Sequence, residues 1–336
     1  MRIPFEDVHA TLAASLRKLS FAHPRADLSA RLFAETTCDG VYSHGVNRFP
    51  RFVAMIRNGA VDPVAEPERI AAFGALERWD GRRGPGNLNA YAAMNRAIEL
   101  SRAHGIACVA LRNTNHWMRG GTFGWQAADA GVVGICFTNT MPNLPPWGGV
   151  SAAIGNNPLI LAVPRSAGPV VLDIAMSQFS YGALESYRKR GAALPVDGGF
   201  DASGTLTRDP AAIEQTQRLL PTGYWKGSGL ATLLDSVAAM LALGNATHQI
   251  ANEPLRETSL SQTFIAIHPA ALGSTGQLNQ IADSIVESVH AATPAEPGKP
   301  VRYPGENTLR LRRENRELGL PIEADVWKQI LSCDAR

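Results

Sequence analysis

The stretch that decides the fold is residues 87–111, which read NLNAYAAMNRAIELSRAHGIACVAL. Apolar residues recur at helical spacing as far as His104, Gly105 follows, and residues 106–111 then form an almost unbroken apolar run. Glycine directly after a helix adopts the left-handed conformation that ends it, and a short apolar run is typical of a buried strand. The segment therefore predicts a helix that turns at Gly105 straight into a buried strand.

The same arrangement occurs a second time and is followed by further strands and helices. Residues 122–130 have a helical pattern, Gly131 ends it, and residues 132–137 are apolar. Alternation of this kind is typical of the α/β and α+β classes, in which helices cover a sheet. Further strands are expected at 158–163, 170–174 and 263–268, and further helices at 179–190, 228–243 and 277–291.

Both ends of the chain have helical patterns instead. Helices are expected at 5–19, 27–37 and 47–58, and again at 307–318 and 323–331, after the proline-rich segment 293–300. We therefore predict a discontinuous helical domain made of residues 1–75 plus 296–336. Residues 76–295 are expected to form a mixed α/β domain that binds cofactor and substrate.

Composition and charge exclude several classes of protein. The chain has 336 residues, of which 45% are hydrophobic and 18% charged, and such a balance is incompatible with a disordered chain. A net charge of +2 without a basic aromatic run gives no support for nucleic-acid binding. Glu6 and Asp7 stand where a signal peptide needs an apolar core, and the apolar stretch 230–243 is too short to span a bilayer. We therefore expect a cytoplasmic protein that does not enter a membrane.

Several common chemical motifs are missing from the sequence. No G-x-G-x-x-G follows a predicted strand, and no phosphate-binding P-loop, H-E-x-x-H or G-x-S-x-G occurs. The widely spaced Cys38, Cys108, Cys136 and Cys333 form no C-x-x-C. Neither a classical dinucleotide fold, a disulfide framework nor a metal site is therefore expected.

The first polar cluster that suggests chemistry is VYSHGVNRFPR, residues 41–51. His44 titrates near neutral pH and suits proton transfer to a developing alkoxide. Arg48, four residues on, suits bidentate binding of a carboxylate. Together they indicate a site for an anionic carbonyl compound. The alternative is an exposed turn in which Ser43 caps a helix and His44 has no chemical role.

Further clusters follow strands or precede helices. His116 lies in RNTNHWMRGG, residues 112–121, directly after a predicted strand, where binding loops commonly form; the alternative is a structural loop histidine. Asp173 ends another strand, where it either orients a reacting group or caps a helix. Glycine-rich GYWKGSG, residues 223–229, enters a helix whose N-terminus favours a cofactor phosphate. GNNP at 155–158 and PGEN at 304–307 are similar polar turns.

Together these segments resemble the type-2 malate/L-lactate dehydrogenase family, in order and over essentially the whole chain. The resemblance rests on YSHG (42–45), NH (115–116), GNNP (155–158), Asp173, KGSG (226–229) and PGE (304–306). The longer runs VYSHGVNRFPRF, ALRNTNHWMRGG, LPVDGGF and GYWKGSG are most similar to the branch that acts on 2,3-diketo-L-gulonate. TMPNL at 140–144, in a loop expected to face substrate, departs from that branch and leaves the sugar acid open.

The resemblance implies a fold, a cofactor and a set of site residues. The fold is that of L-sulfolactate dehydrogenase, a non-Rossmann NAD(P)-binding fold, and the enzyme is implied to be a homodimer. His44 would be the proton donor, with Asp173 orienting a catalytic or substrate group. The expected substrate-binding residues are Ser43, Arg48, His116 and Met141. The expected cofactor contacts are Pro169, Val170, Val171, Leu172, Asp173, Ile174, Ala175, Trp225, Lys226, Gly305, Glu306 and Asn307.

The implied reaction is reduction of a 2-keto sugar acid, 2,3-diketo-L-gulonate to 3-dehydro-L-gulonate, with NADH or, alternatively, NADPH. Within the family, the alternatives are a malate-, lactate- or ureidoglycolate-type dehydrogenase and a cyclic imino acid reductase. From another class, a non-catalytic sugar-acid binding protein would use the same pocket. A metal-dependent hydrolase is not expected, because the sequence lacks the ligand spacing that a catalytic metal site needs.

Overall fold

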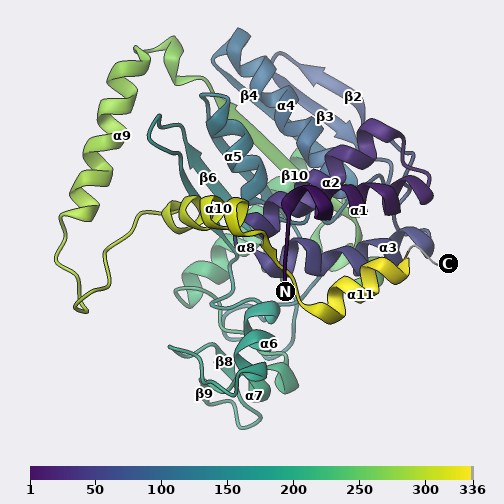
Figure 1. Cartoon of the computed structure of the whole chain (residues 1–336), viewed down its shortest axis with the longest axis vertical. Coiled ribbons are helices and arrows are strands. Elements are labelled where there is room, and N and C mark those ends of the chain that lie inside the picture. The colour runs from purple at the N-terminus through teal and green to yellow at the C-terminus, as the bar shows by residue number, and fades with distance from the viewer. Residues whose placement is uncertain (334–336) are drawn as a thin grey trace.

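The computed structural model describes residues 1–333, and within them the centre is a seven-stranded sheet (Figure 1). Neighbouring strands run antiparallel except for β3 and β4, which are parallel. In spatial order the strands are β2 (Glu68–Phe73), β3 (Leu76–Asp80), β4 (Ile106–Asn115), β10 (Thr258–Ile267), β5 (Val133–Thr138), β6 (Leu159–Val163) and β7 (Val170–Ile174).

Helices cover both faces of this sheet. The helices α4 (Gly86–His104) and α5 (Gly121–Asp129) lie on the face turned to the viewer in Figure 1, and α8 (Trp225–Ala242) lies behind. Met94, Phe123 and Phe264 are fully buried between the sheet and the front helices. The two predicted helix–glycine–strand units are confirmed, because α4 ends at Gly105 with φ 81° and α5 is followed by Gly131 with φ 80°.

A layer of helices joins the two ends of the chain. It contains α1 (Phe5–Lys18), α2 (His23–Cys38), α3 (Phe49–Arg57), α10 (Glu306–Leu318) and α11 (Ala324–Cys333). A short ladder pairs β1 (Arg2–Ile3) with β11 (Leu320–Pro321). Leu12, Phe33 and Ile330 are buried in one shared core. Early and late helices thus share one core, and the division into a discontinuous helical domain stays a prediction.

The structure also differs from the sequence predictions at several strands. Strand β2 lies at 68–73, inside the segment predicted to be helical, because its side chains are all exposed and give no buried apolar signal. Strand β4 extends to Asn115, and β10 begins at Thr258, five residues before the predicted start at 263. The additional residues are largely polar, although most are buried. Their pairing brings the end of β4 to the site described below.

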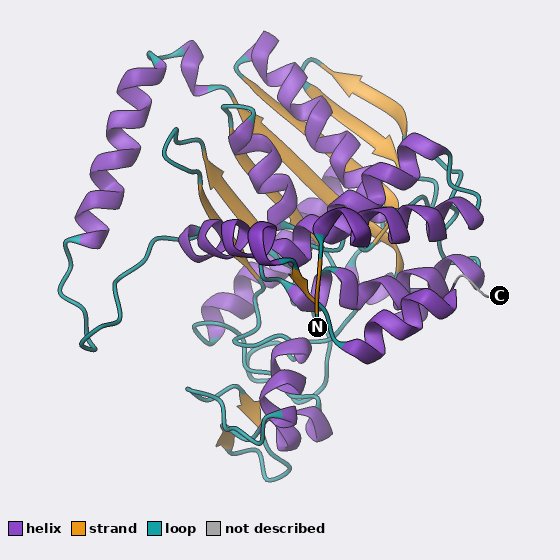
Figure 2. Cartoon of the chain, in the orientation of Figure 1, coloured by secondary structure: helices purple, strands orange, loops and turns teal. Residues whose placement is uncertain are grey.

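Residues 181–222 add a small unit at the lower end of the molecule (Figure 2). The predicted helix at 179–190 is confirmed as α6 (Tyr181–Lys189), but α7 (Pro210–Thr216) and the hairpin of β8 (Gly199–Phe200) and β9 (Leu206–Thr207) were not predicted. Asp209 caps α7 by accepting a hydrogen bond from the amide of Ala211, and Pro210 starts it, which is a recognisable start signal in retrospect.

Helix α9 (Thr275–His290) stands away from the body of the molecule (Figure 1). Arg165 Nε, on the turn between β6 and β7, pairs with Asp283 Oδ1 at 2.6 Å and ties the helix to the sheet edge. A segment without helix or strand, including the predicted proline-rich linker, then leads to α10. Within residues 1–333, none of the helices is both long and apolar enough to cross a membrane.

Candidate active site

The site is a cavity of about 440 Å³ at the junction of the helical layer and the sheet. Six segments form it: the turn after α2, the segment after β4, the loop between β5 and β6, strand β7, the start of α6 and the start of α10. It brings together five of the predicted clusters, although they are far apart in the sequence. The polar and charged side chains on its wall are Ser43, His44, His116, Arg119, Thr140, Asn156, Asp173, Ser180 and Thr308.

His44 reaches the cavity because a tight turn follows α2. It ends the short 3-10 helix η1 (Tyr42–His44), and η2 (Val46–Arg48) follows directly. The amide of Val46 donates a hydrogen bond of 2.7 Å to the buried Thr37 Oγ1. A Cβ on Gly45 would lie 2.1 Å from Thr37 Oγ1 and 2.8 Å from its backbone nitrogen, so only glycine allows this approach. The turn is thereby fixed against α2.

His116 is held by the polar end of β4. The buried Asn115 donates hydrogen bonds of 2.8 and 2.9 Å from Nδ2 to the carbonyls of Arg83 and Gly84. A Cβ on Gly86, at the start of α4, would lie 2.3 Å from the carbonyl oxygens of both Asn115 and His116. The backbone at His116 is therefore clamped between a turn and a helix N-terminus.

The two histidines are stacked but have different hydrogen-bond partners. Their ring centroids lie 5.8 Å apart at an interplanar angle of 24°. The amide of Met118 donates to His116 Nδ1 at 3.0 Å, so a neutral His116 carries its proton on Nε2 and is a hydrogen-bond donor. Ser43 Oγ lies 2.8 Å from His44 Nδ1. This contact leaves Nε2 of His44 as the nitrogen that exchanges a proton with a bound molecule.

Arg48 and Arg51 lie behind the histidines and share one buried carboxylate. Their Nη2 atoms are 3.7 and 3.6 Å from Glu257 Oε2, and Glu257 is only 4% exposed. Arg48 is thus near both imidazoles but is not part of the cavity wall. Two guanidinium groups against one carboxylate leave this side of the cavity positively charged.

Burial and these cations favour neutral imidazoles. Burial, followed by the charges of Arg48, Arg119 and Arg51, lowers the pKa of His44 from 6.5 to about 4. Burial, Arg48, His44 and Arg51 lower the pKa of His116 well below its ordinary value. Burial and Arg51 lower the pKa of Arg48 to about 10, against the opposing effect of Glu257. A bound anion would oppose these cations and favour protonation of His44.

Asp173 occupies the opposite wall, near the end of β7. Its Oδ2 accepts a hydrogen bond of 2.9 Å from the amide of Gly121 and lies 3.5 Å from Arg119 Nε. A Cβ on Gly121 would lie 2.5 Å from the same oxygen. The amide at the N-terminus of α5 therefore holds Asp173, and within residues 1–333 no hydrogen bond joins Asp173 to either histidine.

A backbone cradle forms where α10 meets β7. The amide of Val171 donates to the carbonyl of Pro304 at 3.0 Å. Gly305 has φ 93°, and a Cβ there would lie 3.1 and 3.2 Å from the backbone N and O of Val171. A side chain at 305 would press against the backbone of Val171, so glycine lets the start of α10 lie close to β7. This part of the cavity wall, at a helix N-terminus, suits a flat or anionic group such as part of a nicotinamide cofactor.

The predicted cofactor residues are placed unequally around this cradle. Val171, Leu172, Asp173, Ala175 and Gly305 line the cavity. The others, Pro169, Val170, Ile174, Glu306 and Asn307, are neighbours of these residues in β7 or α10 but are not on its wall.

Trp225 and Lys226 begin α8, which lies next to the end of the β7 segment. The amide of Thr222 donates to the carbonyl of Met176 at 2.9 Å, and a Cβ on Gly227 would lie 3.1 Å from that carbonyl oxygen. Trp225 is 64% exposed. Met141 is not on the cavity wall, whereas its neighbour Thr140 is.

Several wall residues were not predicted individually. Arg119 lay inside the quoted cluster 112–121 and Asn156 inside GNNP, but nothing in their spacing distinguished them from their neighbours. Ser180 and Thr308 belong to helix starts, and Ser180 accepts a hydrogen bond from the amide of Ala183 as a cap.

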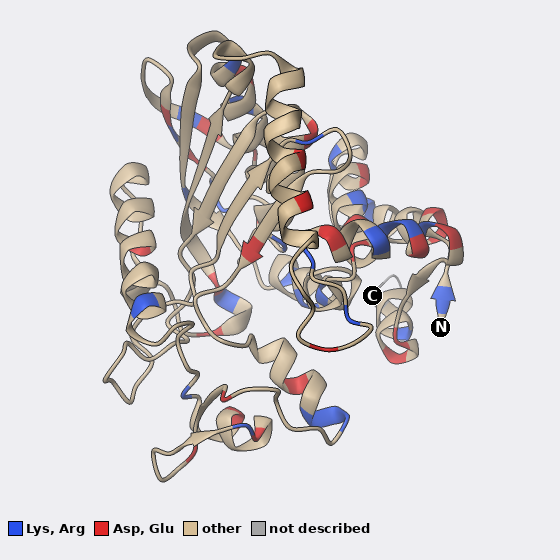
Figure 3. Ribbon diagram, turned by 90° about the vertical axis from the view of Figure 1, so that its left-hand side faces the viewer, with Lys and Arg blue, Asp and Glu red and all other residues tan. Residues whose placement is uncertain are grey.

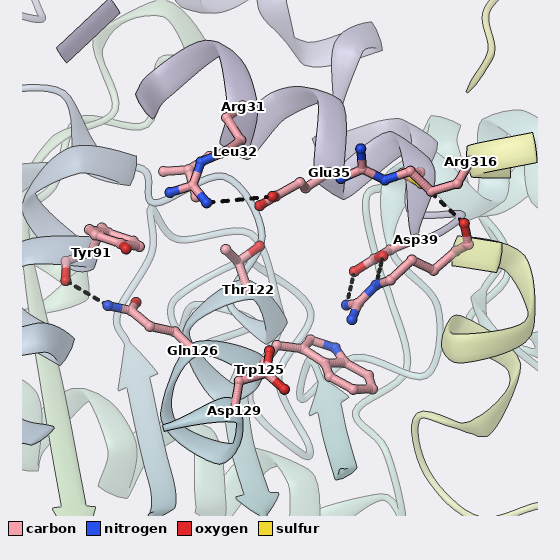
Figure 4. A pocket seen from close by; sticks show the side chains of 12 residues that line it. Arg31, Leu32, Glu35, Asp39, Tyr91, Thr122, Trp125, Gln126, Asp129 and Arg316 are labelled. Carbon is pink, nitrogen blue, oxygen red and sulfur yellow. Dashed lines mark hydrogen bonds and ion pairs between the residues drawn. The ribbon is translucent and has the colours of Figure 1, made fainter. Parts of the chain in front are cut away.

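A second cavity of about 390 Å³ lies between α2, α4, α5 and α10, with Glu35, Asp39 and Trp125 among its lining (Figure 4). In residues 1–333, no three His, Cys, Asp or Glu side chains are grouped as metal ligands.

Comparisons with known proteins agree with this architecture. The model of the malate/L-lactate dehydrogenase family matches residues 3–331. The 2,3-diketo-L-gulonate reductase of Salmonella heidelberg is 46% identical over 330 residues, 98% of this chain and 99% of that protein. Sulfolactate dehydrogenase from Methanocaldococcus jannaschii matches with a TM-score of 0.92 at 25% identity, covering 100% of this chain and 97% of that one. Δ1-piperideine-2-carboxylate reductase from Pseudomonas syringae pv. tomato matches with a TM-score of 0.88 at 26% identity, covering 99% and 98%.

Proposed function

Since the chain belongs to the malate/L-lactate dehydrogenase family, we propose that it reduces the C2 carbonyl of a 2-keto sugar acid, converting 2,3-diketo-L-gulonate to 3-dehydro-L-gulonate. The chain is a nicotinamide-dependent oxidoreductase with the fold of sulfolactate dehydrogenase. The substrate follows the relative that is 46% identical over nearly the full length of both chains.

One observation carries the mechanism: the two stacked imidazoles both present Nε2, but their Nδ1 atoms have different partners. His116 offers a fixed Nε2–H because Nδ1 accepts from the amide of Met118. Nδ1 of His44 instead contacts Ser43 Oγ at 2.8 Å, a hydroxyl that either donates or accepts, so this contact is satisfied in both protonation states of His44. His44 is therefore suited to exchange a proton, and His116 is suited to hold a substrate oxygen.

When bound, a reduced nicotinamide supplies the hydride for the carbonyl carbon. The residues of this chain do the rest. His44 donates the proton from Nε2 to the alkoxide that forms, while His116 and Ser43 bind oxygens near C2 or C3. Arg48 attracts the substrate carboxylate, because its charge acts on the part of the cavity where both imidazoles lie. Asp173 orients a catalytic or substrate group, and Met141 borders the far end of the substrate.

Binding of the anionic substrate also favours the protonated form of His44, which is the acid of the reaction. In the free enzyme three guanidinium groups and burial keep His44 deprotonated. A substrate carboxylate brought near Arg48 partly cancels that field and raises the pKa of His44 again. Binding of substrate and uptake of the catalytic proton are therefore coupled.

The cofactor is NAD in this proposal, with NADP as the alternative. Val171 and Gly305 form the part of the cavity wall where β7 meets the start of α10, and Lys226 at the start of α8 supplies a positive charge near the β7 segment. Trp225, Glu306 and Asn307 complete the proposed contacts.

We propose a homodimer, supported by apolar residues on α8 and α9. Leu233 and Met240 on α8 are 63% and 72% exposed, and Ile281 and Ile285 on α9 are 59% and 60% exposed. Charged residues are sparse on α8, which carries only Lys226 and Asp235. In Figure 3 both α8 and α9 are largely tan, the colour of residues other than Lys, Arg, Asp and Glu. Such faces are typical of subunit contacts. The cytoplasmic location stays a prediction from the sequence.

The deciding experiment is a substrate panel in which oxidation of NADH or NADPH is followed by absorbance. The panel contains 2,3-diketo-L-gulonate, oxaloacetate, pyruvate, the keto acid of ureidoglycolate and a cyclic imino acid. The proposal predicts the highest kcat/KM for the six-carbon keto acid with NADH. Preference for the imino acid would favour the activity named for the Pseudomonas relative, and no turnover of any substrate would leave the binding-protein alternative.

A further inference from the structure

Arg119 is a buried cation in the active-site cavity that none of the roles above uses. It is 5% exposed, lines the cavity, and lies three residues after His116. Its Nη1 donates to Asp39 Oδ2, whereas its Nε has no hydrogen-bond partner in residues 1–333 and lies 3.5 Å from Asp173 Oδ2. The Nε–H is buried beside the Asp173 carboxylate at a distance longer than a normal hydrogen bond, so the guanidinium is incompletely satisfied within residues 1–333 and is suited to pair with an oxygen that a ligand brings to the cavity.

Asp39 holds Arg119 from outside the cavity. It is 5% exposed at the end of α2, and its two oxygens accept hydrogen bonds of 2.6 and 2.8 Å from Nε and Nη2 of Arg312 on α10. Arg312 in turn lies over the ring of Trp125, 4.3 Å from its centroid. Asp39 and Arg312 line the second cavity, and Figure 4 shows Asp39 with its dashed contacts there. Of the three charged residues, Arg119 alone reaches the active-site cavity.

We propose that Arg119 binds an oxygen of the substrate in the active-site cavity and that Asp39 is its positioning residue. The inference rests on the proposed function. The ligand chemistry follows from the donor: a guanidinium N–H pairs with a carboxylate, keto or hydroxyl oxygen, and a sugar acid carries one on every carbon. Arg119 lines the same cavity as His44, and its charge contributes to the lowered pKa of His44.

The arrangement also explains why a buried carboxylate joins two arginines here. Asp39 connects α2 to α10, and α10 begins at the Gly305 that lines the same cavity. The carboxylate thereby fixes the position of Arg119 relative to β7 and the start of α10. Placement of the substrate thus depends on both ends of the chain.

The test compares Arg119→Gln with Arg312→Gln, because each removes one arginine from Asp39 but only Arg119 reaches the cavity. Loss of a charge-assisted hydrogen bond predicts that Arg119→Gln raises KM for the keto acid about 10- to 100-fold. The Kd of NADH, measured by fluorescence, should change by less than about twofold, because the donor serves the substrate. Arg312→Gln should lower Tm yet leave KM within about threefold.

Asp39→Asn tests the positioning role by a double-mutant cycle. Alone it should raise KM, and in the Arg119→Gln background it should raise KM no further, since both changes act on one contact. If Arg119→Gln does not fold, Arg119→Lys, which keeps the charge but loses Nε, should give a smaller rise in KM.

Three results overturn the inference in an active enzyme: an unchanged KM in Arg119→Gln, a weakened Kd of NADH instead, or an equal rise of KM in Arg312→Gln. An additive cycle would overturn the role of Asp39. If the wild-type protein reduces no keto acid, the proposed function fails first. The affinities of oxalate for wild-type protein and for Arg119→Gln, measured by calorimetry, then test whether Arg119 binds an anionic ligand. Weaker binding in the variant supports that role of Arg119, and equal affinities refute it.

Discussion

His44 and His116 face one cavity with stacked rings, but backbone geometry gives them different chemical behaviour. Met118 has φ 68°, and its amide donates a hydrogen bond to His116 Nδ1. The sequence predicted both histidines as site residues from their polar surroundings. It did not assign their tautomers, because the backbone path that brings the Met118 amide to His116 Nδ1 is set by the packing of the loop rather than by residue type.

The residue scale carries a direct prediction for the proton donor. His44→Ala should lower kcat about 10²- to 10⁴-fold, because the alkoxide loses its positioned acid. The Kd of NADH should stay near the wild-type value, since the cofactor cradle is formed by β7 and α10. Steady-state kinetics and fluorescence titration measure the two quantities, with the exposed His104→Ala as control. Near-normal turnover would rule out His44 as the acid.

The pH dependence follows from the low pKa of His44 in the free enzyme, about 4. Reduction needs protonated His44, whose population falls about tenfold for each pH unit above that value, so kcat/KM for reduction should rise as the pH is lowered from about 8 to about 5. Oxidation of the hydroxy acid needs the neutral form and should lose little over the same range. A flat reductive profile, or a slope retained in His44→Ala, would contradict the assignment.

Folding stability should depend on pH with the opposite sign. The pKa of His44 is lowered in the folded state, so between about 4 and 6.5 the unfolded chain binds more protons than the folded one. Stability contributed by a neutral His44 is therefore complete above this window and is lost as the pH falls through it. Urea unfolding of wild type and His44→Gln should differ less at acidic pH than near neutrality if the residue acts this way.

At the scale of elements, glycines decide where helices meet the sheet. The sequence identified the turns at Gly105 and Gly131, because a helical pattern stops and an apolar run begins there. The sequence did not predict the polar ends of β4 and β10. Asn115 and Gln262 are buried there because their side chains are hydrogen-bonded, and such residues leave no apolar pattern in the sequence. These polar ends support His116, so the part of the strands that serves the site is the part without an apolar signal.

Gly305 offers a test at this scale with a built-in control. Gly305 and Gly298 have similar φ angles, 93° and 79°, but only Gly305 contacts other backbone, at Val171. Both changes to alanine carry the cost of a left-handed residue, about 1 kcal/mol. Gly305→Ala should in addition push α10 away from β7 and weaken NADH binding, whereas Gly298→Ala should leave the Kd unchanged. Equal NADH affinities in the two variants would show that the cradle does not contact the cofactor.

For the whole molecule, the sequence indicated that helices from both ends form one unit, and that division of the chain stays a prediction. What it did not indicate is the position of α9. The pattern of Ile281 and Ile285 resembles that of any amphipathic helix with a buried stripe, yet both side chains are exposed. A single sequence does not distinguish a face that packs within the chain from one that packs against another subunit.

Association of subunits is the prediction that belongs to this scale. Ile285→Lys and Met240→Glu each place a charge on a proposed subunit face, so they should shift the protein from dimer to monomer in analytical ultracentrifugation. Val64→Glu, at a 63% exposed position in a loop outside α8 and α9, is the control. A monomeric wild-type protein, or variants that stay dimeric, would exclude these faces as the dimer contact.

The pairing of β1 with β11 has a consequence for how the chain is made. The N-terminal ammonium of Met1 donates to the carbonyl of Ile322, which is 321 residues away. During translation, α1 and α2 are made well before their partners α10 and α11. The apolar surface that the first helices share with α11 therefore stays uncovered until α11 has been made, and a chain released before that point would present it as an aggregation-prone surface.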